Sequence, residues 1–409
     1  MLREGIKTAK FVKNLKKYKS STDEITRKKT LQYLRQSLGQ GGGILLKALQ
    51  YMGTNNPEID EIIYSKENDV NLGLSKNEVI GLISKRYNIK KVFKSITEEA
   101  FPASVGQVQK AYLQNGDTIA LKVQYPKIKS IFKSQIKMLS LIPKISNNTS
   151  FKKWGIDFDS YLKQTELTLS QECNYLYEIE HLKKWDDFLV SDSCSFVPKV
   201  YDEYSHSDMY IQEYVKGDSF SYVKSNWTDE NKSKLAHAML FTYFNLLLNH
   251  NVAQGDTNLG NFLFSVTDGN VKITFIDLGQ AISFNSHFCD SLKGAFSKEL
   301  SSLSYSKYQL LIDLGFDQDK LENISSKVDQ MVDILFYPIK SNNFKFSKWD
   351  YKTELETLLG DDKWWFRSAG GTDFFLFMKS FLGLKNMLIQ LNVNIDISGQ
   401  IRKCIDSDV

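Results

Sequence analysis

Three oxygen-bearing side chains stand within a short stretch of the sequence. Asp256 precedes Asn261 by five positions in GDTNLGN, and Asp277 follows the apolar run VKITFI. A carboxylate at the end of a strand lies outside the strand pairing, and Gly279 lets the backbone turn after it. Carboxylates and phosphate oxygens are the ligands that Mg²⁺ takes in proteins. The pattern predicts a site for Mg²⁺ and phosphate; for either motif alone, the alternative is a loop in which Asp and Asn cap turns.

A lysine inside an apolar strand adds a cation to this set. Lys122 lies in IALKVQY, where an unpaired buried charge would be very costly. Phosphate oxygens and a glutamate on a following helix would both serve as its partner. The candidate glutamates downstream are Glu166, Glu172, Glu178 and Glu180.

The order of these elements is that of protein-kinase phosphoryl-transfer machinery: a strand lysine, a helix glutamate, D-x4-N and then D-L-G. The sequence also departs from the usual kinase motifs, and the absence of A-P-E removes the usual peptide-docking segment. Gln254-Gly255 replaces the usual His-Arg before the catalytic-loop aspartate, no A-P-E follows Asp277, and the next proline is Pro338. The sequence therefore predicts a kinase-like fold and disfavours a protein substrate.

Four motifs resemble one family, the UbiB-like (ADCK) atypical kinases. PASVGQVQKAYLQNGDTIALKVQYPKI (102–128) is similar to its alanine-rich loop followed by SIGQV and VKVQYP. QECNYLYE (171–178) resembles its E-C-D-Y…E segment, and GDTNLGNFLF resembles its D-P-H-P-G-N loop. GGGILLKALQYMG (41–53) resembles its G-P-x-F-I-K-x-G-Q helix. The resemblance covers the chain from about residue 30 to about residue 280.

The resemblance implies a role for each matching residue. Lys122 would hold the nucleotide phosphates with Glu178 as its helix partner, and Asn261 and Asp277 would hold Mg²⁺. Asp256 stands where typical kinases keep the catalytic base. The remaining nucleotide contacts would come from the alanine-rich loop and the hinge QEYV, namely from Ala103, Ser104, Val105, Glu213 and Val215.

The upstream helix would cover this site. Lys47 and Gln50, three positions apart on one helical face, would meet Glu172 and the residue at 174, where a substrate peptide would otherwise lie. Three departures bear on nucleotide preference and rate: Leu49 replaces the family's glycine, Asn174 replaces its acid, and the alanine-rich loop keeps only Ala103. The glycines of 40–43 follow a helix and not a strand, so they lack the context of a phosphate-binding loop.

Composition places the chain among ordinary globular proteins. It has 409 residues with a net charge of +4, and its four cysteines form no CxxC pair, so nucleic-acid binding, disulfides and zinc are not expected. Residues 1–30 hold ten Lys or Arg against three acids among apolar residues, which fits a solvated arm or a basic helix on an anionic membrane. The apolar runs 235–250 and 374–391 are interrupted by His or Lys and are predicted core helices. We expect a soluble cytoplasmic chain with possible peripheral membrane contact.

The coarse order of elements indicates an α+β fold. Helices are predicted at 21–53 and 75–86, opened by the capping boxes Ser21…Glu24 and Ser75…Glu78. Strands are predicted at 90–96, 104–113 and 117–126, the last two joined by Asn115-Gly116. Helices at 127–142 and 157–187 and strands at 196–204 and 208–215 follow, then the short strands 261–265 and 271–277 in a helical remainder. The predicted domains are a helical extension (1–89), a kinase-like N-lobe (90–215) and a helical C-lobe (216–409).

We therefore expect an atypical kinase or ATPase that binds ATP or ADP with Mg²⁺. The resemblance implies a role in isoprenoid-quinone or other lipid metabolism, with a lipid or quinone-precursor ligand. The alternatives are a Ser/Thr protein kinase, a nucleotide-binding scaffold without turnover, and a peripheral lipid-binding module. Intact Asp256, Asn261 and Asp277 argue against a scaffold.

Overall fold

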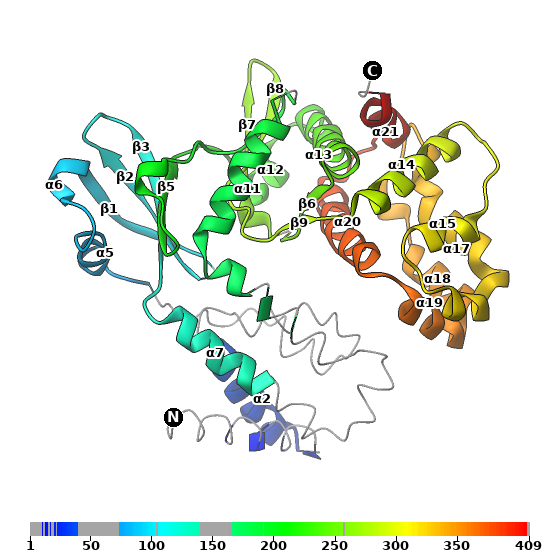
Figure 1. Ribbon diagram of the computed structural model, residues 1–409, viewed down its shortest axis with the longest axis horizontal. Coiled ribbons are helices and arrows are strands. Elements are labelled where there is room, and N and C mark those ends of the chain that lie inside the picture. Colours follow the sequence, from blue (N-terminus) through cyan, green and yellow to red (C-terminus); the bar gives the residue numbers. More distant parts are fainter. Residues whose placement is uncertain are drawn as a thin grey trace. The chain divides into compact units, whose positions relative to one another are not determined.

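A computed structural model describes most of the chain. The described residues are 23–39, 73–103, 105–139, 169–190, 192–256 and 258–406, with a few single residues at 10–21 and 163–167. The chain divides into two compact units, the first made of Met1–Tyr177 and Val200–Tyr214, the second of Glu178–Lys199 and Val215–Val409. The first unit carries a four-stranded sheet, and the second carries most of the helices (Figure 1).

The sheet of the first unit is antiparallel throughout, in the order β1-β2-β3-β5. Its strands are β1 (Phe93–Pro102), β2 (Gly106–Leu113), β3 (Thr118–Gln124) and β5 (Met209–Glu213). The predicted hairpin is confirmed, because Gly116 takes the left-handed backbone (φ 97°) that the turn between β2 and β3 needs. This pairing sets Lys122 of β3 opposite Val108 of β2 and Tyr210 of β5.

One face of this sheet packs under helix α5 (Lys76–Ile83). The predicted capping box is confirmed: the Ser75 hydroxyl accepts from the Glu78 N–H, and the Glu78 carboxylate accepts from the Ser75 N–H. Val79 and Ile83 of α5 join a buried core with Leu121 and Val123 of β3. Side chains alternate between the faces of a strand, so Lys122 projects to the opposite face. The short helix α6 (Ile89–Val92) leads into β1.

Two further helices begin in the first unit. Helix α7 (Ile128–Leu139) starts directly after β3, and α11 (Tyr175–Phe188) starts in the first unit and continues into the second. The prediction of one helix over 157–187 was wrong at Cys173–Asn174, where the helix is interrupted. The Asn174 side chain accepts a hydrogen bond from the Leu176 N–H (3.3 Å) and so starts α11.

The N-terminal helix α2 (Glu24–Gly39) also starts differently from the prediction. Asp23 caps it, accepting from the Ile25 N–H (3.3 Å) and the Thr26 N–H (3.0 Å). The Ser21 hydroxyl donates to the carbonyl of Asp23 instead. The capping box of Ser21 with Glu24 was therefore wrong, because the helix begins two residues later than a Ser21 cap requires. The rest of the predicted helix, 40–53, lies outside the described residues.

The second unit holds two small sheets beside a long helix. Strands β7 (Phe262–Thr267) and β8 (Asn270–Phe275) form a hairpin whose turn residues, Asp268 and Gly269, both have positive φ. The two-residue strand β4 (Ser195–Phe196) adds to β8 in parallel. Strands β6 (Val252–Gln254) and β9 (Ala281–Ser283) pair antiparallel.

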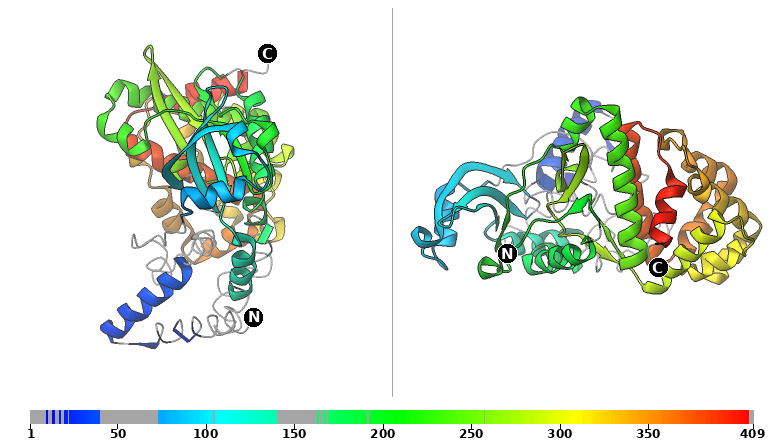
Figure 2. Two further views of the ribbon diagram at one scale, coloured as in Figure 1. Left: turned by 90° about the vertical axis from the view of Figure 1, so that its left-hand side faces the viewer. Right: turned by 90° about the horizontal axis from the view of Figure 1, so that it is seen from above.

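Helices make up the remainder of the second unit. Helix α13 (Asp229–His250) lies beside α20 (Thr372–Leu391) and α21 (Ile397–Asp406), as Figure 2 shows. The other helices are α12 (Phe220–Asn226), α14 (Ser286–Leu300), α15 (Lys307–Asp313), α16 (Gln318–Leu321), α17 (Val328–Phe336), α18 (Tyr351–Leu359) and α19 (Lys363–Ala369). Short 3-10 turns occur at Asp202–Tyr204, Leu259–Asn261, Glu322–Lys327, Tyr337–Lys340, Phe346–Lys348 and Gly360–Asp362.

Both apolar runs of the sequence form helices with large buried faces. In α13 and in α20 the buried set includes Leu240, Phe244, Phe377 and Phe381. Within the described part of the chain, α20 is the one helix long and apolar enough to cross a membrane, a test that buried core helices also pass. Its aromatic contacts with α13 fit a core helix.

Two strand predictions need correction. The segment 196–204 forms only the β4 end and a bridge from Val200 to Gln212, and Asp202–Tyr204 is a 3-10 turn. Pro198 has no N–H to donate to a strand ladder, so pairing is interrupted there. The strand predicted at 90–96 begins only at Phe93, because 89–92 form the helical turn α6.

Candidate functional site

Asp256 and Asp277 lie on two loops of the second unit that are joined by the side chain of Gln254. This residue ends β6 and is 7% exposed. Its amide Nε2 donates to the Asp277 carbonyl (2.7 Å), and its Oε1 accepts from the Asp256 N–H (3.4 Å). One buried amide thus connects the backbone at Asp256 with the backbone at Asp277.

The loop from Asp256 to Asn261 is held by its own side chains. Asp256 Oδ1 accepts from the Asn258 N–H (3.0 Å), and Asn258 Oδ1 accepts from the Gly260 N–H (3.0 Å). Asn261 Nδ2 donates to the Asp256 carbonyl (3.2 Å). Because an amide is planar, this bond fixes the direction of the Asn261 Oδ1 atom as well. The five-residue spacing therefore brings Asp256 and Asn261 into one loop.

The second loop begins where β8 ends. Asp277 follows Phe275 by two residues, and its Oδ1 accepts from the Gly279 N–H (3.0 Å). Asn261 also reaches this segment, because its carbonyl accepts from the Ile276 N–H (3.0 Å). Leu278, the next residue, is fully buried and anchors the turn that follows Asp277.

Close backbone packing fixes the two loops against each other. The Gly255 N–H donates to the Gln280 carbonyl (3.1 Å), next to the β6–β9 pairing. A Cβ at Gly255 would lie 2.3 Å from that carbonyl oxygen and 2.7 Å from Ile282 Cγ1, closer than any real Cβ approaches. Gly255, which replaces the usual arginine before the aspartate, is therefore required by packing.

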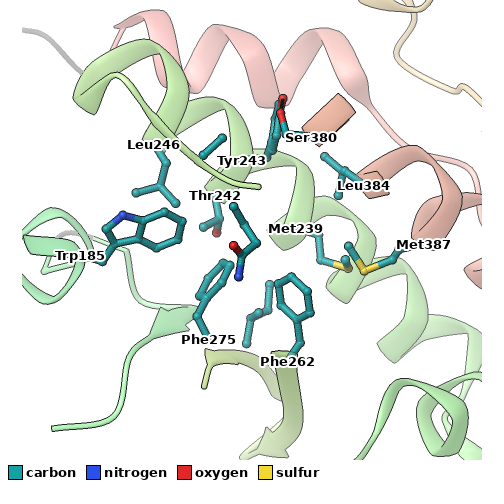
Figure 3. A pocket seen from close by; sticks show the side chains of 13 residues that line it. Trp185, Met239, Thr242, Tyr243, Leu246, Phe262, Phe275, Ser380, Leu384 and Met387 are labelled. Atoms are coloured by element: carbon teal, nitrogen blue, oxygen red, sulfur yellow. Dashed lines mark hydrogen bonds between the residues drawn. The ribbon is translucent and has the colours of Figure 1, made fainter. Parts of the chain in front are cut away.

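A small apolar cavity of about 40 Å³ lies behind these loops. Figure 3 shows Trp185 of α11, Tyr243 of α13 and Phe275 of β8 around it, and Gln254 also lines it. A cavity of this size has room for a few water molecules and none for a nucleotide. Gln254 therefore makes its two hydrogen bonds at the edge of an apolar space, where little water competes for them.

The donor set of these loops fits Mg²⁺ bound together with phosphates. Asp256, Asn261 and Asp277 supply two carboxylates and an amide oxygen, the hard donors that Mg²⁺ accepts. Among the described residues, no group of three or more His, Cys, Asp or Glu is placed to hold a metal ion alone. A cation here would therefore need phosphate oxygens or water to complete its coordination.

In the first unit, Lys122 is only 4% exposed. Its Nζ lies 5.4 Å from the ring centre of Tyr210, the residue paired with it on β5. The Tyr210 hydroxyl donates to Gln212 Oε1 (3.2 Å), and its ring meets Tyr175 edge to face at 5.3 Å. These neighbours limit the directions open to the Lys122 ammonium, and burial makes its charge a strong attractor for anions.

The predicted phosphate loop is tightly turned at its described residues. The Ala103 N–H donates to the Gly106 carbonyl (2.8 Å), and the Tyr125 N–H donates to the carbonyl of Val105, which is 4% exposed. A Cβ at Gly106 would lie 2.2 Å from the Val123 carbonyl and 2.7 Å from the Tyr175 hydroxyl. Ser104 lies outside the described residues.

Burial separates the four candidate glutamates. Glu166 is exposed, and Glu180 is exposed and pairs with Lys184 one turn further along α11 (2.7 Å). Glu172 and Glu178 are 6% and 4% exposed. Only the last two are buried enough to offset a buried lysine.

The remaining predicted residues lie either where the first unit ends and the second resumes or outside the described residues. Glu213 ends β5 opposite Ile119, and Tyr214 continues the pairing through its N–H to the Thr118 carbonyl (3.2 Å). Val215 begins the second part of the second unit. Lys47 and Gln50 lie outside the described residues.

Two residues of the site were missed by sequence reasoning. Gln254 was read only as a departure from the kinase motif, and Tyr210 was read only as a strand residue. Gln254 had a signal, since a polar residue between the apolar Val252-Ala253 and Gly255 needs a hydrogen-bond partner when buried. Tyr210 had none, because its contact with Lys122 depends on strand pairing across 88 residues of chain.

Comparison with known proteins gives one family model, the ABC1 atypical kinase-like domain, which matches residues 74–303, more than half of the chain. Among curated relatives, the chloroplastic protein ACTIVITY OF BC1 COMPLEX KINASE 7 of Arabidopsis thaliana is 26% identical over 69% of this chain and 40% of that protein. The mitochondrial atypical kinase COQ8 of Saccharomyces cerevisiae is 25% identical over 52% of this chain and 42% of that protein. The chain thus spans about two fifths of the length of these relatives.

Among solved structures, the Rv3197–erythromycin complex from Mycobacterium tuberculosis aligns with a TM-score of 0.58 at 19% identity. The alignment covers 92% of this chain and 95% of that chain. At this identity the likeness shows the fold alone. The match to the ABC1 atypical kinase-like domain, together with the mixed helices and strands, confirms the predicted α+β, kinase-like class.

Proposed function

The chain belongs to the ABC1 family of atypical kinase-like proteins, as its resemblance to the UbiB-like kinases predicted, and we propose that it binds and turns over Mg-ATP. The family itself supports a kinase-like phosphotransferase. The roles of individual residues, the binding of Mg²⁺ and the hydrolysis of ATP are what we propose beyond the family.

The hydrogen-bonded pair of loops in the second unit carries this proposal. Gln254 ties the backbone of Asp256 to that of Asp277, and Asn261 is bonded to both loops. Such a network holds oxygen donors in place before a ligand arrives, and preorganised polar groups are the main source of catalysis in phosphoryl transfer. A pair of unrelated surface loops would not need a buried amide connecting them.

Each residue has a distinct task in the proposed site. Asp277 and Asn261 hold Mg²⁺, which neutralises charge on the phosphates when bound. Lys122 positions the phosphates, and Glu178 orients Lys122. Asp256 either accepts a proton from the attacking hydroxyl or water molecule or orients that nucleophile.

The remaining assignments follow the family pattern. Ala103, Ser104 and Val105 approach the phosphates, and the backbone at Glu213 and Val215 meets the adenine. Lys47, Gln50 and Glu172 exclude a substrate peptide, which supports a small-molecule substrate and leaves the Ser/Thr protein kinase as the alternative.

The test separates binding from chemistry with two matched variants. Asp256→Asn should keep Mg-ATP binding and lower phosphate release at least ~100-fold, the usual range for a general base. Lys122→Met should weaken binding itself. Phosphate release that is equal in wild type and Asp256→Asn would overturn the catalytic assignment. Mg-ATP binding without phosphate release or transfer in the wild type would establish the nucleotide-binding scaffold instead.

A further part of the proposal concerns substrate and location. We assign the chain to isoprenoid-quinone or other lipid metabolism, supported by the family resemblance. Its relatives carry chloroplastic and mitochondrial names, while for this chain we propose a cytoplasmic location with peripheral membrane contact through the basic N-terminus. Flotation with anionic liposomes, with and without residues 1–20, tests the contact. Equal flotation of both chains would remove the N-terminus from the proposal.

A further inference from the structure

The first unit contains a basic groove of about 330 Å³ whose lining shares no residue with the proposed nucleotide site. Its lining residues come from the end of α5, the turn from β3 into α7 and the loop that enters β5, and Figure 1 labels these elements. Its charged lining residues are Lys85, Arg86, Lys127, Lys129 and Asp208. A volume of this size is at the lower end of the range of small-molecule sites.

Positive charge is concentrated in this groove. Four cations and one carboxylate give its described lining a net charge of +3, whereas the whole chain has +4. Arg86 is bound in a bidentate pair by Asp208 (2.6 and 3.1 Å), which raises the pKa of the arginine. Among the described residues, Lys85, Lys127 and Lys129 form no ion pair. Clustered cations in a concave surface raise the local concentration of anions.

Lys122 is not among the residues that line the groove, which lies at the end of β3 and mainly on the α5 side of the sheet. Val123, which lines the groove, packs in the core beneath α5 with Val79 and Ile83. Lys122, its neighbour on β3, projects to the other face. An anion in the groove is therefore a different ligand from a phosphate held by Lys122.

The walls of the groove are preformed. Tyr125 is 6% exposed and donates its N–H to Val105, and Gln124 Nε2 donates to the Ser207 carbonyl (3.2 Å). Lys127 adopts a left-handed backbone (φ 69°), which is unfavourable for a lysine and which glycine adopts without cost. A lysine therefore occupies a position where glycine would be more stable, directly at the groove.

We propose that the basic groove binds an anion with at least two negative charges, of the phosphate monoester or diphosphate class. The inference does not rest on the proposed function, because none of the residues that line the groove belongs to the proposed nucleotide site. The same chemistry is found in a soluble phosphorylated metabolite and in a lipid headgroup, and the experiment distinguishes these two sources.

The first arm titrates the full chain with inorganic pyrophosphate by calorimetry. The variant Lys127→Gly combined with Lys129→Gln should weaken binding by about 25-fold, at about fivefold for each lysine, the Coulombic effect of one close charge pair in water. Glycine keeps the left-handed backbone, so the variant should fold at least as well as wild type. Asp208→Asn should have the opposite effect and tighten binding by about fivefold, since it removes the one carboxylate of the described lining.

Two controls assign the effect to the groove. Lys91→Gln, an exposed lysine of the same unit outside the groove, should leave pyrophosphate binding unchanged. The groove variants should keep wild-type Mg-ATP binding, whereas Lys122→Met should not. Pyrophosphate binding that is lost in Lys122→Met and kept in the groove variant would overturn the proposal.

The second arm uses sedimentation with vesicles of phosphatidylcholine, with and without phosphatidic acid. Binding to the acidic vesicles that the groove variant loses supports the proposal and identifies a lipid headgroup. Pyrophosphate binding without vesicle binding supports it with a soluble ligand. Equal behaviour of wild type and groove variant in both arms would overturn it.

Discussion

Replacing Gln254 with methionine removes the amide that joins the two aspartate loops while keeping side-chain length. The bond to the Asp277 carbonyl is short (2.7 Å), and the bond from the Asp256 N–H is long (3.4 Å), so the second counts at the low end. A neutral hydrogen bond contributes about 0.5–1.5 kcal/mol, which gives about 1–2 kcal/mol for the pair. For a unit of this size, each kcal/mol lowers the melting temperature by about 2–4 °C.

The free energy lost with the two hydrogen bonds of Gln254 should also lower the affinity for Mg-ATP. If Gln254 holds the loops in the arrangement that binds Mg-ATP, the variant must restore that arrangement on binding. About 1–2 kcal/mol corresponds to a Kd raised about 5- to 30-fold. Calorimetric titration of ATP with and without Mg²⁺ measures this change, and the loss should concern the Mg-dependent part.

The matched control is Gln400→Met on α21. Gln400 is also 7% exposed in the second unit and takes no part in the loop network. It should leave the Mg-ATP affinity unchanged, whatever its effect on melting temperature. If Gln254→Met and Gln400→Met bind Mg-ATP equally well, the coupling of the loops through Gln254 is refuted.

Two further predictions concern packing and acid stability. Gly106→Ala places a Cβ 2.2 Å from the Val123 carbonyl, so it should lower both the melting temperature and the nucleotide affinity. Gly81→Ala places its Cβ where no atom lies within 4 Å, so it should stabilise α5 by about 0.5–1 kcal/mol. Equal melting temperatures for the two variants would contradict this prediction. Burial raises the pKa of Glu299, but hydrogen bonds from Lys340 and Tyr305 outweigh it and hold the pKa below its usual 4.5. A lowered folded pKa contributes stability above the unfolded value that is lost as pH falls through the folded one. The difference in melting temperature between wild type and Lys340→Met should therefore be large at neutral pH and shrink below pH 4.5; a constant difference would show that the pair does not act through this carboxylate.

Local signals predicted the elements whose stabilising contacts are local. The turn at Asn115-Gly116 and the capping box of Ser75 and Glu78 depend on residues within four positions of each other. The strand expected at 196–204 failed because β8, the partner of its first residue, lies 78 residues further along the chain, and because Pro198 interrupts the pairing. Asp268-Gly269 was a usable hairpin signal between β7 and β8, since both residues have positive φ.

In the candidate site, too, sequence reasoning predicted the short-range features and missed the long-range ones. The spacing of Asp256 and Asn261 within one loop is short-range, and the structure brings both residues together. The role of Gln254 depends on a carbonyl 23 residues away, and no local pattern indicates that distance. Burial also separates Glu178 from Glu180; both were among the four candidates for pairing with Lys122, and only the family resemblance favoured Glu178.

Asp277 and Asn261 are the proposed ligands of the Mg²⁺ that accompanies a bound nucleotide. The most direct measurement is a thermal-shift titration of wild type and Asp277→Asn with ATP and ADP, with and without Mg²⁺. A ligand that binds only the folded state adds about 2.7 kcal/mol to the free energy of unfolding at a concentration of 100 Kd, and this raises the melting temperature. The account predicts a Mg-dependent shift in wild type that Asp277→Asn loses. A shift of equal size in both proteins, or none in wild type, would contradict it.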